Sequence, residues 1–149
     1  RKINNEDLRD HITYVNQKTT MFDDTIINNI KRGNNVSEDD IRKLIHKYGL
    51  RDIFSDIDGN IDGEAGVHGG NLSLGMSKTI MILRGILRSK KIVIFDEPLA
   101  GLDSNSRKKI LTLIEEKCRN KTVIIISHNQ KLLPYVDRTI RLSDYTNKN

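Results

Sequence analysis

The sequence predicts an α/β fold in which a largely parallel β-sheet is flanked by helices. Strand and helix patterns alternate from Lys91 onward, and the runs Ile92 to Phe95 and Val123 to Ile126 are apolar at every position. Runs of this kind are typical of strands that helices cover on both faces, as in parallel sheets. The chain has 149 residues, which is enough for one domain with a substantial core but not for two large domains.

The N-terminal part of the chain predicts one strand, two polar helices and a long loop. The β-rich run Ile12 to Val15 suits a strand that leads into a loop. Asp24 can cap a short helix that ends at Ile30, and Ser37 can cap a second helix. The apolar side chains of this second helix share one face: Ile41, Leu44 and Ile45. The segment Ser55 to Asn71 is dense in Asp and Gly, and we expect it to form a long surface loop.

The C-terminal part predicts further strands and helices in alternation. Strands are expected at Lys91 to Phe95, Thr122 to Ile126 and Thr139 to Leu142. Helices are expected at Ser104 to Cys118 and Gln130 to Val136. In a parallel sheet, ligand chemistry collects in the loops just beyond the carboxyl ends of the strands. These loops are therefore where candidate functional residues are expected.

Charge and composition exclude several classes of function. The formal net charge is +5 and the isoelectric point is near 9.4, but Lys and Arg are interspersed with Asp and Glu along the whole chain. This pattern indicates compositional bias rather than a basic patch, so no nucleic-acid partner is expected. Cys118 is the only cysteine, which excludes an internal disulfide. No stretch approaches the roughly 20 apolar residues that span a bilayer, so any membrane role is expected to involve another segment or chain.

Two adjacent acidic residues give the strongest chemical signal in the sequence. Asp96 and Glu97 follow the apolar run that ends at Phe95. Carboxylates in such a place are costly unless they are paired or bind a metal. At the end of a strand, one carboxylate can hold Mg²⁺ while its neighbour orients and deprotonates an attacking water. We therefore expect Asp96 to be a metal ligand and Glu97 to be the catalytic base of phosphoryl chemistry.

Other polar residues at strand ends and helix starts have both a functional and a plain structural explanation. Gln17 follows the first predicted strand and His128 follows the run that ends at Ile126. Taken singly, a His after a strand is more often structural, and a Gln in a loop can be a simple hydrogen-bonding residue. Ser73 and Asp103 can each be helix caps without any further role.

Four ordered motifs resemble the ATP-binding cassette (ABC) ATPases. The segment Ile92 to Asp103 reads IVIFDEPLAGLD and resembles the Walker B strand, the catalytic glutamate and the D-loop of this family. The sequence YVNQ, which ends at Gln17 and precedes MFDDTIINNI, resembles the Q-loop of exporter-type cassettes. GEAGVHGGNLSLG, from Gly63 to Gly75, resembles the loop and signature motif, and VIIISHN, from Val123 to Asn129, resembles the switch-histidine strand.

The resemblance implies a P-loop NTPase-like parallel sheet flanked by helices, with an inserted α-helical signature subdomain. It divides the chain into a Q-loop strand and loop (1–22), a helical subdomain with the signature motif (23–90), and a core part with Walker B, D-loop and switch histidine (91–149). By this resemblance, we expect the three segments together to form one partial ABC ATPase domain.

The resemblance also implies ATP and Mg²⁺ as cofactors and gives the site residues their roles. Gln17 is expected to sense both the metal and the lytic water, and His128 is expected to contact the γ-phosphate in the transition state. Ser73, at a helix N-terminus that favours phosphate, and Gly75 are expected to reach the γ-phosphate of a nucleotide held by the opposite subunit. Asp103 is expected at the dimer interface.

The partners implied by the resemblance are a second ABC ATPase domain, in a homodimer or a heterodimer, and a transmembrane domain in the same or another chain. ATP hydrolysis would then drive transport, in the export direction, from the cytoplasmic face of a membrane, while this segment itself is expected to be soluble. The cargo is beyond the sequence, because membrane segments select it. A DNA-associated ABC ATPase is the weaker alternative, because no heptad pattern separates Gln17 from Ser73.

Three features depart from the family pattern. No Gly-rich loop with Lys and Ser or Thr occurs, so we expect this phosphate cradle (Walker A) upstream of Arg1 and expect residues 1–149 alone to be inactive. Leu74 replaces a usual Gly and is expected to crowd the approach of phosphate. Met76 replaces a usual Gln and cannot supply its amide hydrogen bonds. These departures leave open a degenerate or regulatory subunit, or a heterodimer with one weakened site.

Overall fold

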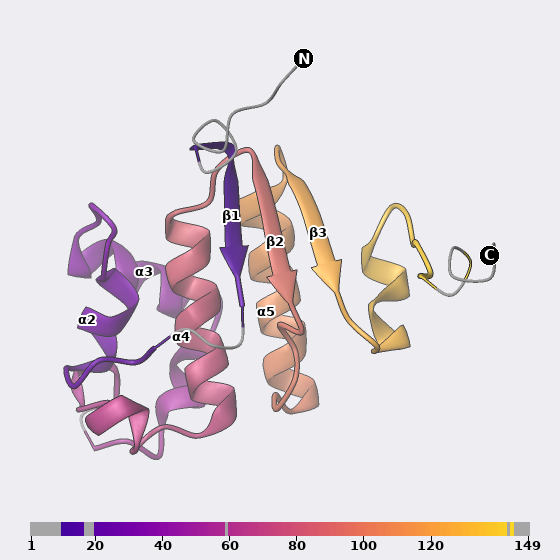
Figure 1. Cartoon of the computed structure of the whole chain (residues 1–149). Helices are drawn as coiled ribbons and strands as arrows, with labels where there is room; N and C mark the ends of the chain where they lie inside the picture. The colour runs from indigo at the N-terminus through magenta and orange to yellow at the C-terminus, as the bar shows by residue number, and fades with distance from the viewer. Residues whose placement is uncertain (1–9, 17–19, 59, 143, 145–149) are drawn as a thin grey trace.

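The chain folds into a parallel three-stranded β-sheet with helices packed against it. A computed structural model describes residues 10–16, 20–58, 60–142 and 144. The strands are β1 (Ile12–Val15), β2 (Ile92–Asp96) and β3 (Thr122–Ile126), in the spatial order β1-β2-β3 (Figure 1). Both pairings are parallel, which confirms the predicted α/β class.

The two long helices lie on the same side of this sheet. They are α4 (Leu74–Leu87) and α5 (Ser104–Cys118), and each connects two neighbouring strands (Figure 1). Val93 and Phe95 point toward this layer and are fully buried. Successive right-handed crossovers that advance in one direction across a sheet place their helices on one face, which explains why both helices cover the same side.

The opposite face of the sheet is open in the part of the chain that the structure describes. Tyr14, Ile124 and Ile126 lie on this face and are 53%, 45% and 49% exposed. The prediction that helices cover both faces of the strands is therefore wrong for the described residues. An apolar run shows that a strand can be buried on both sides, but the direction of the crossovers decides which side receives the helices.

A group of short helices packs beside α4. It contains α2 (Ile26–Lys31) and α3 (Glu38–Lys47), followed by 3₁₀ turns at Leu50–Phe54, Asn60–Asp62 and Val67–Gly69. The predicted cap of α3 is confirmed, because the Ser37 side chain accepts a hydrogen bond from the Asp40 amide.

The cap of α2 differs from the prediction. Thr25, rather than Asp24, is the N-cap residue, and its side chain accepts a hydrogen bond from the Asn28 amide. Asp24 lies one residue earlier, where its Oδ1 accepts hydrogen bonds from the Thr25 amide and the Asn28 side chain. Both residue types can cap a helix, and the backbone geometry selects the one directly before the first helical residue.

The segment from Ser55 to Asn71 is more ordered and more buried than a surface loop. Ile61 is 7% exposed and Ala65 is fully buried. Its backbone pairs with the start of α2, since the Ala65 amide donates to the Asp24 carbonyl at 2.9 Å. The prediction of a long surface loop is therefore wrong in part. The Asp and Gly residues of this segment form turns, but a few of its apolar residues anchor those turns in the core.

The C-terminal elements also differ from the predictions. Residues Gln130–Tyr135 form a 3₁₀ helix that contains Pro134, rather than an α-helix over Gln130 to Val136. Proline removes an amide donor that an α-helix would need. The segment from Thr139 to Leu142 does not form a strand, and Ile140 is 61% exposed. Beyond β3 the described residues offer no neighbouring strand with which this segment could pair. Among the described helices, none is long and apolar enough to cross a bilayer.

Candidate functional site

The centre of the sheet delivers the two adjacent carboxylates to one edge. Phe95 is fully buried and pairs with Val15 and Ile125 in the strands on either side. Asp96 is the last residue of β2, and Glu97 follows it directly. Because all three strands are parallel, their carboxyl ends meet at this edge, as the sequence predicted. The pairing register of the three strands therefore determines where Asp96 and Glu97 lie at this edge.

The hydroxyl of Tyr14 contacts the first of these acids. Tyr14 lies on β1 and donates a hydrogen bond to Oδ2 of Asp96 at 2.9 Å. This hydrogen bond, with a smaller effect of burial, raises the pKa of Tyr14 above its ordinary value. In the sequence, nothing marks Tyr14 as functional beyond its place in the predicted strand. Only the pairing of β1 with β2 brings it to Asp96.

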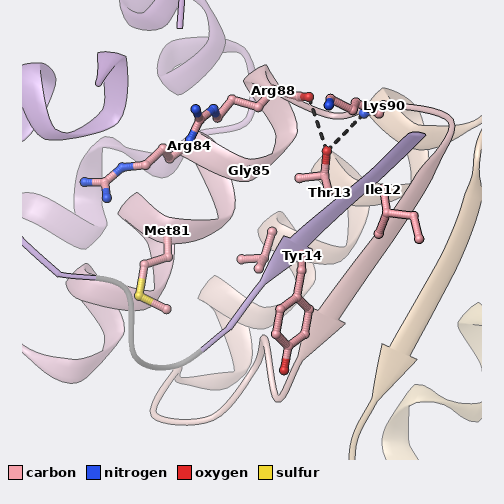
Figure 2. Close-up of a pocket in the computed structure, with 9 residues that line it drawn as sticks. Ile12, Thr13, Tyr14, Met81, Arg84, Gly85, Arg88 and Lys90 are labelled. Atoms are coloured by element: carbon pink, nitrogen blue, oxygen red, sulfur yellow. Dashed lines mark hydrogen bonds between the residues drawn. The ribbon is translucent and has the colours of Figure 1, made fainter. Parts of the chain in front are cut away.

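Strand β1 is itself tied to the end of α4. Thr13 Oγ1 donates to the Arg88 carbonyl at 3.2 Å and accepts from the Lys90 amide at 3.1 Å, as the dashed lines in Figure 2 show. Further along the strand, Val15 packs so closely against Gly85 of α4 that a Cβ on Gly85 would lie 2.2 Å from Cγ2 of Val15. A cavity of about 260 Å³ lies between β1 and α4 (Figure 2). These contacts hold β1 in the register that Tyr14 needs.

The second acid, Glu97, is held by the loop that follows β3. Ser127 Oγ donates to Glu97 Oε2 at 2.9 Å, and the His128 amide donates to Oε1 at 3.0 Å. The Nδ1 atom of His128 lies 2.7 Å from the same Oε1. The Glu97 side chain is 20% exposed, whereas the His128 side chain is 88% exposed. The predicted pair of Glu97 and His128 is thus in direct contact, with the imidazole facing outward.

The charge state of Glu97 follows from these contacts. Burial raises the pKa of its carboxyl, but the hydrogen bonds from His128 and Ser127 outweigh burial and leave the pKa below its ordinary value. Glu97 is therefore an ionised carboxylate at neutral pH, as a general base must be. The imidazole beside it has a second ring nitrogen that can form a hydrogen bond with a ligand.

The backbone of Glu97 has an unusual conformation. Its φ is +46°, in the left-handed region that costs a residue other than Gly about 1 kcal/mol or more. Such a conformation persists only where the surroundings impose it. The Glu97 amide donates to the Ile126 carbonyl at 2.9 Å, and its own carbonyl accepts from Lys78 Nζ at 3.0 Å. Both peptide groups of this residue are therefore fixed.

The signature segment forms the N-terminus of α4. Ser73 is the N-cap, and its Oγ accepts from the Met76 amide at 3.2 Å while its own amide donates to Met76 Sδ at 3.4 Å. The Leu74 side chain is 61% exposed and lies against Gly101, where an added Cβ would lie 2.6 Å from it. The start of α4 therefore carries an apolar side chain at its surface, next to free amides that favour anions.

Asp103 caps the next long helix. Its Oδ1 accepts hydrogen bonds from the amides of Asn105 and Ser106, at 2.8 and 3.1 Å. Hydrogen bonds from Ser106, the side chain first, lower the pKa of Asp103. A cavity of about 320 Å³ is lined by Ser73, Gly75 and Asp103 together. The structure thus brings the three predicted nucleotide-binding residues to one cavity.

The predicted residues form two separate groups in the described structure. Asp96, Glu97 and His128 gather at the carboxyl edge of the sheet, and none of them is among the described residues that line the cavity at the start of α4. Gln17 lies outside the described residues. Sequence reasoning missed Lys78 as a partner of Glu97, although a lysine inside the apolar face of a helix was a usable signal.

The carboxyl edge of the sheet has the donors that a magnesium nucleotide requires. Mg²⁺ is usually held by one or two carboxylates together with phosphate oxygens and waters. Asp96 offers such a carboxylate, with Oδ2 engaged by Tyr14. Within residues 10–16, 20–58, 60–142 and 144, no group of three or more His, Cys, Asp or Glu side chains could hold a metal ion. Asp96 therefore suits a Mg²⁺ ion that phosphate oxygens and waters also hold.

Comparison with known proteins gives consistent matches. A family model described as "ABC transporter" matches residues 1–100. The chain is 33% identical over 138 residues to a "Putative export ATP-binding/permease protein" of Rickettsia bellii, and 30% identical over 141 residues to the "ATP-dependent lipid A-core flippase" of Vibrio vulnificus. Each alignment covers 93% of this chain and 24% of the relative.

The fold of this chain is also similar to that of a solved ABC exporter structure. Its title is "Structure of a bacterial Atm1-family ABC exporter with ATP bound". The TM-score is 0.75 at 26% identity, over 86% of this chain and 23% of that protein. The present chain therefore spans about a quarter of the length of the proteins it matches.

Proposed function

The chain belongs to the ABC transporter family, and from that premise we propose that it is the hydrolytic part of an ATPase that drives export across a membrane. The observation that carries the proposal is the geometry of Glu97, an ionised carboxylate in contact with His128 at the carboxyl edge of the sheet. Such a carboxylate can orient and deprotonate the water that attacks a phosphoryl group.

In this proposal each residue at the sheet edge has one task. Glu97 accepts the proton of the attacking water. His128, which contacts Glu97 and faces outward, donates a hydrogen bond to the γ-phosphate. Asp96, with Gln17, would hold Mg²⁺, which would supply positive charge to the phosphate oxygens.

The residues around the start of α4 serve a second nucleotide in the same proposal. Ser73 and Gly75 lie at a helix N-terminus that favours anions, and Asp103 lines the same cavity. This group is separate from the sheet edge, which supports a composite site in which one subunit completes the site of another. The partner is a second ABC ATPase domain.

The names of the relatives support export and a membrane partner. One relative is named as an export ATP-binding/permease protein, another as a lipid A-core flippase, and the matched solved structure is an ABC exporter. We infer that this chain acts with a transmembrane domain, in the same or another polypeptide, at the cytoplasmic face of a membrane. By itself, the segment 1–149 contains no Gly-rich loop with Lys and Ser or Thr, and we propose that it has no ATPase activity alone.

The test is Glu97→Gln in the full-length protein. This change keeps the size of the side chain but removes the base, so we expect kcat for ATP to fall by about 100-fold or more. Glu115→Gln is the matched control, because Glu115 is an exposed acid of α5, and its turnover should equal that of the wild type. Unchanged turnover in Glu97→Gln would show that the assignment of the base is wrong.

A degenerate or regulatory subunit is the second candidate, and Leu74 favours it. An exposed leucine lies at the start of α4, where the approach of a phosphate needs open space. The number of ATP molecules hydrolysed per dimer separates the two candidates. A regulatory subunit would bind nucleotide and show no loss of turnover in Glu97→Gln.

A further inference from the structure

Lys78 is a charged residue in the interior of the molecule. It lies on α4, one turn beyond the capping residue Ser73, and is only 3% exposed. Its ammonium group donates a hydrogen bond to the backbone carbonyl of Glu97 at 3.0 Å. Burying a cation is costly unless a partner compensates for the lost water. The contact with Glu97 is therefore a specific arrangement rather than a chance approach of a surface lysine.

The electrostatic surroundings of Lys78 show what compensates for burial. Burial lowers the pKa of its ammonium group, while the negative charges of Asp96 and Glu97 oppose that effect. The two carboxylates are adjacent in sequence and repel each other, so a cation next to both stabilises the pair. Lys78 thus compensates the charge of the same two acids that the proposed mechanism uses.

The contact also acts on the strained backbone of Glu97. Its amide is held by the Ile126 carbonyl, and its carbonyl accepts from both Lys78 Nζ and the Ala100 amide. These hydrogen bonds fix the two peptide planes that determine φ at Glu97, whose value is +46°. The direction of the Cα–Cβ bond, and so the position of the carboxylate, follows from these planes.

We propose that Lys78 is a positioning residue that holds the backbone of Glu97 in its left-handed conformation and so aims the catalytic carboxylate. This inference rests on the proposed role of Glu97 as the base. It also links two regions, since Lys78 belongs to the helix whose first turn carries Ser73 and Gly75. A displacement of α4 on nucleotide binding would act on Glu97 through this side chain.

The test is a double-mutant cycle in the full-length protein with Lys78→Met and Glu97→Gln. The rate of ATP hydrolysis is divided by the amount of nucleotide that the protein binds. Misfolded molecules, which bind no nucleotide, then do not affect the value. We expect Lys78→Met to lower kcat by about 10- to 100-fold, because small misplacements of a catalytic group have effects of this size, and to change KM for ATP by less than about threefold. In the Glu97→Gln background, the same change should have almost no further effect.

Thr79→Val is the matched control for a change in the interior of α4. Thr79 is fully buried, and its hydroxyl donates only to the Gly75 carbonyl one turn earlier in the helix, so its kcat should stay within about twofold of the wild type. If Lys78→Met does not bind nucleotide, Lys78→Gln replaces it in the cycle, with the same dependence on Glu97 expected.

Two results would overturn the role of Lys78. The first is wild-type turnover in the Lys78 variant, and the second is an equal loss in the wild-type and Glu97→Gln backgrounds, which would indicate a purely structural role. Both leave the proposed function intact, provided that Glu97→Gln alone lowers turnover by about 100-fold. If Glu97→Gln alone has no effect, the proposed function itself fails.

Discussion

The carboxyl edge of the sheet and the start of α4 differ in how completely their polar groups are held. At the sheet edge, Glu97 receives hydrogen bonds from Ser127 and His128 on its side chain and from Lys78 on its carbonyl. At the start of α4, Ser73 is engaged only in capping its own helix, and Leu74 is exposed beside it. The polar groups of the first region are held by several distant segments of the chain, whereas the second region is open.

This difference follows from where each region lies. The sheet edge is built from strands that are far apart in sequence but adjacent in space, so many neighbours converge on Glu97. A helix N-terminus is a local structure whose unpaired amides face outward. Substitutions at the sheet edge are therefore expected to lower kcat, whereas substitutions at the start of α4 are expected to have a smaller effect, on nucleotide affinity.

The largest effect is expected at the sheet edge, in His128→Ala. Removing the imidazole deletes one of the groups that hold Glu97 and the proposed contact with the γ-phosphate, so kcat for ATP should fall by about 100-fold. Steady-state ATPase assays on the full-length protein would measure this change. His46→Ala, in an exposed histidine of α3, is the control and should retain full turnover. A His128 variant with normal kcat would remove the imidazole from the mechanism.

A smaller effect, in affinity, is expected at the open region, in Leu74→Gly. The smaller residue uncovers the amides at the start of α4, so nucleotide affinity of the dimer should rise by about tenfold, the equivalent of one gained charge-assisted hydrogen bond. Titration with a fluorescent ATP analogue would measure the affinity. The side chain of Leu74 also lies against Gly101, so a thermal-unfolding control is needed. If a folded Leu74→Gly variant bound nucleotide as well as the wild type or more weakly, Leu74 would not hinder the approach of phosphate.

The smallest effect is expected in the pH dependence of stability. The pKa of Glu97 lies below its ordinary value of 4.5, so its hydrogen bonds stabilise the folded protein above that value, and this contribution is lost as pH falls through the folded-state pKa. Ser127→Ala removes one donor and should move this loss to higher pH. Urea unfolding at a series of pH values from neutrality down to about pH 3, below the ordinary pKa of a carboxyl group, would detect it. Identical pH profiles for Ser127→Ala and the wild type would show that Ser127 does not hold the carboxylate.

The secondary structure was predictable where the local sequence pattern and the tertiary packing favour the same element. Strands β1 and β3 and helix α5 lie at their predicted residues, because apolar runs and helix caps act locally. The segment from Thr139 to Leu142 has a strand-like composition but is not a strand, because a strand also needs a partner. In the same way, an apolar run in β3 did not reveal that Ile124 and Ile126 would be exposed on one face.

The sequence predicted which residues belong to the candidate site, but it did not predict the contacts between them. The order of the motifs was enough to single out Asp96, Glu97 and His128, and the structure places Glu97 against His128. Tyr14 carried no such signal, and Lys78 was marked only as a lysine within the apolar face of a helix. Each reaches the acids from an element distant in sequence, so its role depends on which neighbours the fold provides.

The sequence by itself determined which residues are chemically suited to the reaction and in which elements they lie. An apolar strand followed by two acids, or a Ser before an amphipathic helix, is a local pattern that can be read from the order of residues. Only the tertiary structure decided the left-handed backbone of Glu97, the buried contact with Lys78 and the open face of the sheet. These features depend on burial and on hydrogen bonds between distant segments, whose free energies arise only when the chain is folded.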